Sequence, residues 1–273
     1  MSDIKVVMGH NIDVENVNAT ASFDLENTKP KVTLPEESNL NLFWKNELKV
    51  DNAYIITVKG NKESEEYSRR CQESCDKVGM NYLVWDAFNG IDGNISPPAH
   101  LKNETFFKLL KVTDHYMTKG EVACALSHIS LWYECAKIDK PIVILEHDAV
   151  MTRKFSSFNS FNSIVYLGGA EWALNNWPVH PIPPHASDGP NYKFICRAHA
   201  YAIDPCMAKN LLSHVLKIGI CSPLDIMVRA DLFNITHQGP YAYDLNKNKT
   251  NDTTIKNRPL EGRTTKRNPN LEW

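Results

Sequence analysis

The sequence contains no long hydrophobic run. None of its apolar stretches approaches the roughly 20 residues that a membrane-spanning helix needs, so no membrane span is expected. Its opening residues, MSDIKVVMGHNID, lack the basic and then apolar pattern of a secretory signal. The seven cysteines are odd in number and show no paired metal-ligand spacing, which predicts reduced thiols. Together these absences predict a soluble protein of the cytoplasm, or of the host cytoplasm if its source is viral.

Net charge is also nearly absent. The 273 residues carry 30 Lys and Arg against 32 Asp and Glu, a formal net charge of −2. Nothing in that balance favours nucleic acid or an anionic membrane as a partner. Hydrophobic residues make up 42% of the chain, which is enough for a sizeable core. One large domain, alone or with extensions, is therefore expected.

Composition changes along the chain and predicts three segments. Residues 1–50 hold eight acidic against five basic residues and few periodic patterns, which predicts a loosely attached extension with a short strand near Lys5–Met8. Residues 51–245 alternate between strand-like and helix-like patterns and are expected to form the main domain. Residues 246–273 hold seven Lys and Arg against three Asp and Glu, which predicts a basic, solvated tail.

The main domain opens with a pattern typical of a nucleotide-binding sheet. A β-rich run at Ala53–Val58 precedes a charged amphipathic helix at Lys62–Val78, which Gly79 closes, and a second strand follows at Asn81–Asp86. Further along, the patterns predict helices at Gly120–Ile138, Pro205–Lys217 and Pro223–Leu232, and strands at Ile142–Leu145, Ser163–Leu167 and Lys193–Ile203. An α/β domain is therefore predicted.

The stretch Ile142–Asp148, IVILEHD, is the most informative in the chain. Its apolar part fits a buried strand of a parallel sheet, and such sheets bind ligands beyond the carboxyl ends of their strands. That end carries Glu146, His147 and Asp148, which could hold a divalent metal against a diphosphate. Mg²⁺ and Mn²⁺ prefer a few carboxylates plus substrate oxygens. Taken alone, however, the tripeptide is better explained as a charged strand end that faces solvent than as a metal site.

The residues before this strand add a second motif, KGEVACALSHISLW at positions 119–132. Together with ILEHDA it resembles glycosyltransferase family 25, the lipopolysaccharide and collagen hydroxylysine galactosyltransferases, which show KGExGCxLSHxxLW and then an acidic triplet, usually EDD. Two positions depart from the family pattern: Ala123 replaces a Gly and His147 replaces the middle Asp. Weaker similarity over about residues 52–245 includes AYIITV (53–58), DAFNGID (86–92), VYLGG (165–169), AYAID (200–204) and SPLDIM (222–227).

The resemblance implies an α/β domain of the GT-A type, with a mixed, mostly parallel sheet flanked by helices. It also implies transfer of a sugar from a UDP-sugar to a hydroxyl acceptor, with Mn²⁺ or Mg²⁺, by direct displacement with inversion. A saccharide of lipopolysaccharide or a related surface glycan is the implied acceptor. The family carries Asn-Leu-x-Arg after the first strand, where this chain has residues 57–60, Thr-Val-Lys-Gly. The sugar of the donor is therefore left open, and a pentose is included.

Four residues are candidate metal ligands by resemblance. Asp148 is expected to bind the metal directly or through water, and the alternative for it is a turn cap. Glu146 matches the first acidic position of the family triplet. His147 could ligate Mn²⁺ as a neutral imidazole or point away. His237 could supply a late ligand, although an ordinary strand residue is the simpler interpretation.

Asp225, in SPLDIM, matches a late family Asp and is the candidate general base, which would take the proton of the acceptor hydroxyl. The alternative is an Asp favoured by the dipole in the first turn of a helix, and Asp188 is a weaker candidate base. Glu146 is the second candidate catalytic residue. The residues expected to bind the donor or frame its site are Thr57, Asp86, Phe88, Lys119, Glu121, Ser127, His128, Glu146 and Gly168.

Three alternatives remain open from the sequence. The acceptor could be protein hydroxylysine, or a hydroxymethylated DNA base flipped from its duplex by a phage enzyme. In the DNA case, a basic tail and an aromatic loop would contact the duplex through Lys256, Arg258, Arg263, Lys266, Arg267, Trp172 and Trp177. The third alternative is a degenerate protein that binds a sugar nucleotide without catalysis, which His147 in the triplet would permit.

Overall fold

The computed structural model describes residues 47–90, 95–114, 116–159, 161–169 and 198–244, and three short strands at 21–22, 31–32 and 180–181. Contacts within the chain divide it into two units, Met1–Glu47 and Leu48–Trp273. In the first unit, β1 (Ala21–Ser22) pairs antiparallel with β2 (Lys31–Val32). The strand predicted near residues 5–8 and the basic tail lie outside the described residues, and the three-segment division remains a prediction.

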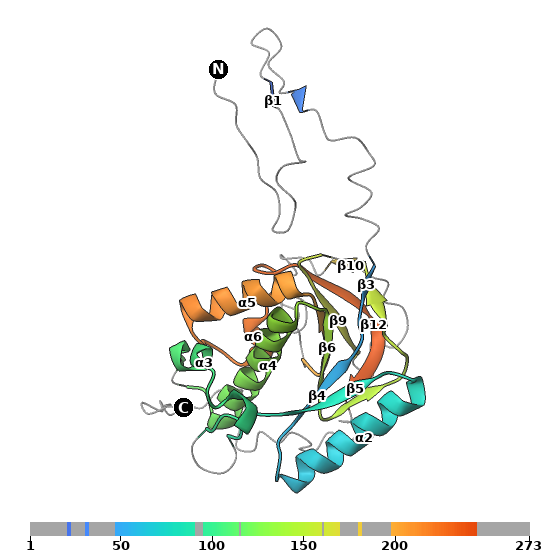
Figure 1. Ribbon diagram of the computed structural model, residues 1–273, viewed down its shortest axis with the longest axis vertical. Coiled ribbons are helices and arrows are strands. Elements are labelled where there is room, and N and C mark those ends of the chain that lie inside the picture. Colours follow the sequence, from blue (N-terminus) through green and yellow to red (C-terminus); the bar gives the residue numbers. More distant parts are fainter. Residues whose placement is uncertain are drawn as a thin grey trace. The chain divides into compact units, whose positions relative to one another are not determined.

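The second unit is built on a curled, mixed sheet (Figure 1). Its strands follow the order β10-β12-β9-β11-β6-β4-β5, and β7 pairs with β12 beside this path. The bounds are β4 Ala53–Thr57, β5 Tyr82–Asp86, β6 Ile142–Glu146, β7 Ala149–Met151, β9 Ile164–Gly169, β10 His180–Pro181, β11 Ala200–Ile203 and β12 Ile235–Asp244. A separate pair joins β3 (Leu48–Lys49) to β8 (Ser157–Phe158).

The sheet is mixed, as predicted, but it is not mostly parallel. β4 pairs in parallel with both β5 and β6, and β9 pairs in parallel with β12. The other four pairings among the described strands of this sheet are antiparallel. The reason is β11, which enters between β6 and β9 in the opposite direction to both. The parallel part that matters for ligand binding is the β5-β4-β6 set, whose carboxyl ends meet at one edge.

Helices cover both faces of this sheet (Figure 1). One face packs against α4 (Lys119–Ile138) and α5 (Pro205–Ile218), and the other packs against α2 (Lys62–Val78). The residues of each strand alternate between the two cores: Ile142 and Ile144 of β6 join the α4 side, whereas Val143 and Leu145 join the α2 side. Both faces are therefore buried, which explains the continuous apolar run in β6.

The helix boundaries follow from local caps. Asn61 accepts a hydrogen bond from the Ser64 backbone at the start of α2, and Gly79 ends that helix in the left-handed conformation at φ 69°. The predicted helix and its glycine stop are thus confirmed. The helix predicted at Pro223–Leu232 is shorter than expected, because only α6, Leu224–Met227, is helical. Two short elements were not predicted, the 3₁₀ turn η2 (Ala99–Leu101) and α3 (Thr105–Leu109).

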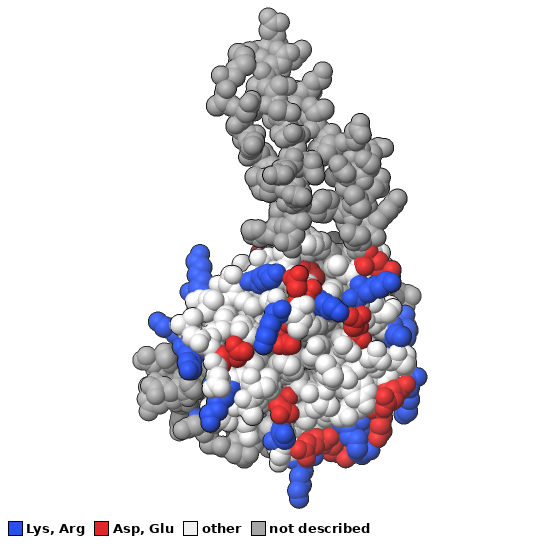
Figure 2. Space-filling view, in the orientation of Figure 1, with Lys and Arg blue, Asp and Glu red and all other residues white. Residues whose placement is uncertain are grey.

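The surface of the described residues is mixed in charge. Figure 2 shows Lys and Arg side chains interspersed with Asp and Glu on the face that it presents. On α2, for example, Arg69 pairs with both Glu66 and Glu73. Among the described residues, no helix has the length and apolar character needed to cross a bilayer.

Candidate active site

The Glu-His-Asp triplet divides at the end of β6. The alternation of this strand carries Glu146 to the side of α4 and the next residue, His147, to the side of α2. There the Nδ1 atom of His147 lies 3.2 Å from the Ser64 hydroxyl, and its ring stacks on Tyr67 with the centroids 5.7 Å apart. The first two members of the triplet therefore have different neighbours, on α4 and on α2.

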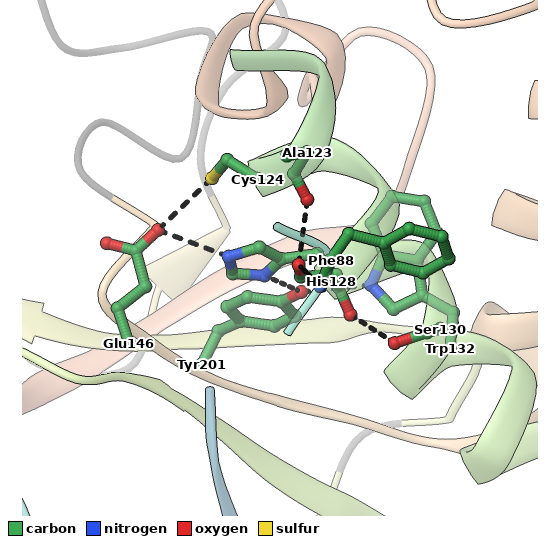
Figure 3. A network of polar contacts seen from close by, with 9 residues as sticks. Phe88, Ala123, Cys124, His128, Ser130, Trp132, Glu146 and Tyr201 are labelled. Atoms are coloured by element: carbon green, nitrogen blue, oxygen red, sulfur yellow. Dashed lines mark hydrogen bonds and ion pairs between the residues drawn. The ribbon is translucent and has the colours of Figure 1, made fainter. Parts of the chain in front are cut away.

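Glu146 ends a chain of hydrogen bonds that runs through the core (Figure 3). Its Oε1 atom lies 3.1 Å from Nε2 of His128, whose Nδ1 lies 2.9 Å from the Tyr201 hydroxyl. The indole Nε1–H of Trp132 donates to that same hydroxyl at 2.9 Å. A carboxylate can only accept, so Nε2 of His128 donates to Glu146, and with the proton assigned to Nε2, Nδ1 accepts from the Tyr201 hydroxyl. All donors thus point in one direction, from Trp132 to Glu146.

This chain controls the charge of Glu146. Burial alone would raise the pKa of the carboxyl group, but the hydrogen bond from His128 and the neighbouring imidazoles outweigh it and lower that pKa. The side chain of Glu146 remains 26% exposed, whereas that of His128 is 1% exposed. A deprotonated, partly exposed carboxylate is consequently held in fixed orientation at the sheet edge.

A pocket of about 100 Å³ opens beside this carboxylate. The carboxyl ends of all three parallel strands reach it, through Val58 after β4, Ala87 after β5 and Glu146 of β6. The remaining lining residues are Ile56, Phe88, Gly90, Gly120, Ala123, Cys124, Ser127, His128, His147 and Asp148. The pocket is therefore at the position where sheets of this kind bind ligands.

Further carboxylates lie near the same pocket. Burial is the main cause that raises the pKa of the Cys124 thiol well above its ordinary value, and the charges of Glu146, Asp225 and Asp148 raise it further. Asp148 lines the pocket within the turn that follows β6. Asp225 is half-buried in α6, which packs against α4. The structure thus brings the two catalytic candidates and Asp148 into one region.

The predicted residues of the helix motif have mainly architectural contacts. Glu121 forms a capping box with Thr118, in which the Glu121 carboxylate accepts from the Thr118 backbone at 2.8 Å. The Ser127 hydroxyl accepts from the Phe88 backbone at 2.9 Å and donates to the Ala123 carbonyl. These contacts fix the start of α4 against the loop after β5. Lys119 is the first residue of α4.

Other predicted donor residues differ in how they approach the pocket. Phe88 is buried and forms part of its wall. Asp86 lies at the end of β5, where its carboxylate is 3.7 Å from the Lys59 ammonium. Thr57 points instead into the contact with α2, where its hydroxyl donates to Ser68 at 2.7 Å. The side chain of Thr57 is thus engaged in packing in this structure.

Gly168 and His237 form a separate group on β9 and β12. The Nε2 atom of His237 is 3.0 Å from the Gly168 carbonyl, and a Cβ atom built on Gly168 would come within 2.6 Å of the His199 ring and of the Tyr166 hydroxyl. His237 is a buried strand residue, as the simpler interpretation held. Its role as a metal ligand stays a prediction. Asp188, Trp172 and Trp177 lie outside the described residues.

Sequence reasoning missed the residues that hold Glu146 in place. Tyr201 and Trp132 are each fully buried, and Tyr201 comes from β11, 69 residues further along the chain than Trp132. An aromatic residue in a buried strand is an ordinary core signal, so nothing local marks Tyr201 as part of a polar chain. Cys124 and His128 lie four residues apart on α4 and therefore share a face, and both contact Glu146.

Replacing Tyr201 with phenylalanine is expected to lower the free energy of unfolding by about 1–3 kcal/mol, because the Trp132 indole and the His128 Nδ1 atom would lose their buried partner. Urea denaturation measures the change. Tyr133→Phe is the matched control, because its hydroxyl donates to Glu104 at a half-exposed site where water can replace it. Equal losses of unfolding free energy in the two variants would contradict a buried chain of hydrogen bonds through Tyr201.

Acid is expected to destabilise the fold, beginning near pH 6.5. Burial lowers the pKa of His147 below its ordinary value of 6.5, so the unfolded chain binds the proton first as pH falls. Denaturant titrations at a series of pH values measure how steeply the free energy of unfolding falls with pH, and His147→Gln should reduce that slope by up to about 1.4 kcal/mol per pH unit. Some slope should remain, because burial also lowers the pKa of His100 and His214. An unchanged slope would mean that His147 is not buried as a neutral ring.

The comparison with known families agrees with this geometry. Residues 50–177 match a model of sugar-transferring enzymes, and the chain is therefore a glycosyltransferase. The matching model is that of glycosyltransferase family 25 (LPS biosynthesis protein), and residues 50–177 are similar to this family. The matched range holds Cys124, His128, Glu146 and Asp148, whereas Asp225 lies beyond it. No curated protein matches the chain.

Proposed function

We propose that this pocket binds a UDP-sugar with Mn²⁺ or Mg²⁺ and transfers the sugar to a hydroxyl group of a glycan. One observation carries the proposal: a deprotonated Glu146, oriented by His128 and Tyr201, lies in a pocket at the carboxyl ends of three parallel strands. Ligand sites of α/β sheets lie at such ends, and the family match supplies the class of reaction.

The pocket offers separate surfaces for the parts of a nucleotide sugar. Ile56, Val58 and Phe88 provide an apolar wall for the nucleoside. The first turn of α4, through Gly120 and Ala123, faces the opening, and a helix N-terminus favours phosphate. Gly90 packs so tightly against this turn that a Cβ atom there would lie 2.5 Å from the Lys119 carbonyl. A side chain at residue 90 would therefore disturb the phosphate end.

The carboxylates of Glu146 and Asp148 fit a hard divalent cation, because both line the pocket and both supply oxygen ligands. Such a cation, when bound, neutralises the charge that develops on the departing nucleotide. His128 fits this role less well, because Mg²⁺ and Mn²⁺ favour carboxylate and water oxygens over an imidazole nitrogen. His128 instead orients the carboxylate and keeps it deprotonated.

Transfer by direct displacement also needs a group that accepts the proton of the acceptor hydroxyl. Asp225 is the proposed base, since it lies near enough to the pocket to raise the pKa of the Cys124 thiol. The proposed acceptor is a saccharide of lipopolysaccharide or a related glycan, in keeping with the family description. The residues that would favour DNA instead lie outside the described part of the chain.

The test is release of UDP from a panel of UDP-sugars, with and without Mn²⁺, in the presence of glycan acceptors or hydroxymethylcytosine DNA. We expect metal-dependent release with one donor, stimulated by a glycan. Asp148→Asn should raise the Mn²⁺ concentration needed for half-maximal release. UDP release that does not depend on Mn²⁺ would contradict the proposed metal dependence. Stimulation by DNA alone would contradict the proposed glycan acceptor.

A further inference from the structure

Three potential ligand atoms converge at the pocket from two elements. Cys124 and His128 lie four residues apart on α4, and Glu146 faces them from β6 (Figure 3). Their Sγ, Nε2 and carboxylate oxygen atoms all lie within 4.8 Å of one another. Two of the separations are 3.8 Å, from Sγ to Oε1, and 3.1 Å, from Nε2 to Oε1. Such a grouping joins a thiol, an imidazole and a carboxylate, and Mg²⁺ chemistry does not use the first.

We propose that Cys124, His128 and Glu146 form a binding site for Zn²⁺ or a similarly soft divalent cation, which shares only Glu146 with the all-oxygen site proposed for Mn²⁺ or Mg²⁺. Thiolate and imidazole ligands select such cations, whereas carboxylate and water suit the harder ones. A three-residue set with a fourth position open to the pocket is the arrangement of zinc sites that keep a water or ligand.

The distances suit this cation. Zn²⁺ binds sulfur at about 2.3 Å and nitrogen or oxygen at about 2.0–2.2 Å, so tetrahedral ligands lie about 3.3–3.7 Å from one another. The two separations at Glu146 Oε1 therefore need to change by only a few tenths of an ångström. His128 is also held from behind by Tyr201, and metal-binding imidazoles are regularly oriented by such a partner.

Binding has a defined proton balance. The Cys124 thiol loses its proton to the buffer on forming the metal–sulfur bond. His128 stays neutral while its proton moves from Nε2 to Nδ1, where the Tyr201 oxygen accepts it. The phenol then gives up its own donation to His128, which limits the affinity gained. Zn²⁺ binding should accordingly release one proton and strengthen as pH rises.

Occupation of this site would have a consequence for transfer, which rests on the function proposed above. Glu146 belongs to both cation sites, so Zn²⁺ would withdraw it from Mn²⁺ and inhibit the enzyme. Binding itself does not depend on that function and is measured without any sugar nucleotide. A failure of the zinc site and a failure of the proposed activity are therefore distinguishable.

The test is titration of the metal-free, full-length chain with Zn²⁺ against a chromophoric chelator, and with Co²⁺ as a spectroscopic substitute. We expect the thiolate-to-Co²⁺ charge-transfer absorption and strong visible bands of tetrahedral Co²⁺. Cys124→Ser should abolish that absorption and weaken Zn²⁺ binding by at least about 100-fold, since even outer partners contribute 10–100-fold. Cys206→Ser is the matched control, being another half-buried thiol beside a carboxylate, Asp204.

Each outcome decides the proposal. Loss of the Co²⁺–thiolate absorption in Cys124→Ser, with the Cys206→Ser variant unchanged, would support it. Absence of that absorption in the wild-type chain, or Zn²⁺ binding by Cys124→Ser at wild-type affinity, would overturn it. The wild-type Co²⁺ spectrum needs no variant, so the proposal stays testable even if Cys124→Ser folds poorly.

Discussion

Glu146→Gln is expected to lower the turnover number of sugar transfer by about 100- to 1000-fold, the range found when one preorganised electrostatic group is removed from an active site. The substitution keeps the shape of the side chain, and its amide oxygen still accepts from Nε2 of His128 at the position of Oε1. Only the negative charge is lost. Stability should therefore change little, which separates a catalytic loss from unfolding.

Glu104→Gln is the matched control for this variant. The side chain of Glu104 is 29% exposed, close to the 26% of Glu146, and it too accepts a hydrogen bond, from the Tyr133 hydroxyl. Glu104 lies outside the pocket, so its variant should retain turnover. Steady-state kinetics at saturating UDP-sugar and Mn²⁺ measure both variants. Comparable turnover in the two would show that the charge of Glu146 takes no part in transfer.

Binding of Mn²⁺ gives a second measurement on Glu146→Gln. If Glu146 holds the cation, the variant should need more Mn²⁺ for half-maximal activity, which is also the result expected for Asp148→Asn. If it instead contacts the sugar or ribose, the Mn²⁺ requirement should stay unchanged while turnover falls. The two results assign the carboxylate to the metal or to the donor.

Much of the fold around the site could be predicted from local signals. The continuous apolar run of Ile142–Leu145 and the charged helix ending at Gly79 both depend on neighbours in the sequence, and both predicted elements are confirmed. The direction of β11 could not be predicted in this way, because strand direction depends on the long connection before it. That antiparallel strand makes the sheet less parallel than the resemblance implied.

The candidate site was predictable only in part, for the same reason. The motif predicted Glu146 and His128 as site residues, but the residues that orient them come from distant positions. Tyr201 reaches His128 from another strand, and the pleat of β6 then separates Glu146 from His147. All three residues of the triplet line the pocket, but alternation at the end of the strand gives Glu146 and His147 different neighbours, on α4 and on α2. Geometry of this kind appears only when the helices on both faces are in place.

Asp225 presents the opposite case, because resemblance placed it at the site and local structure alone would not. It occupies the first turn of α6, a position where the helix dipole favours any carboxylate. Its neighbours Leu224 and Met227 are buried in the core beside α4 and α5. They anchor the short helix, so that the half-buried carboxylate is held near Cys124 and the pocket. The arrangement fits a base that meets the acceptor.

Asp225→Asn is expected to lower transfer to the acceptor by about 10²–10⁴-fold, the contribution of a positioned general base, while the affinity for UDP and Mn²⁺ stays near wild type. UDP-sugar kinetics with saturating acceptor measure the first, and calorimetric titration with UDP measures the second. Asp231→Asn is the control, because that carboxylate pairs with Arg229 in the same segment and its loss should cost about 1 kcal/mol of stability or less.

A general base must also be deprotonated to act, so the wild-type rate should fall towards acid pH and the residual rate of Asp225→Asn should lose that dependence. If the transfer rate of the variant still falls towards acid pH, the general base is another group, and Glu146 would then be the next candidate.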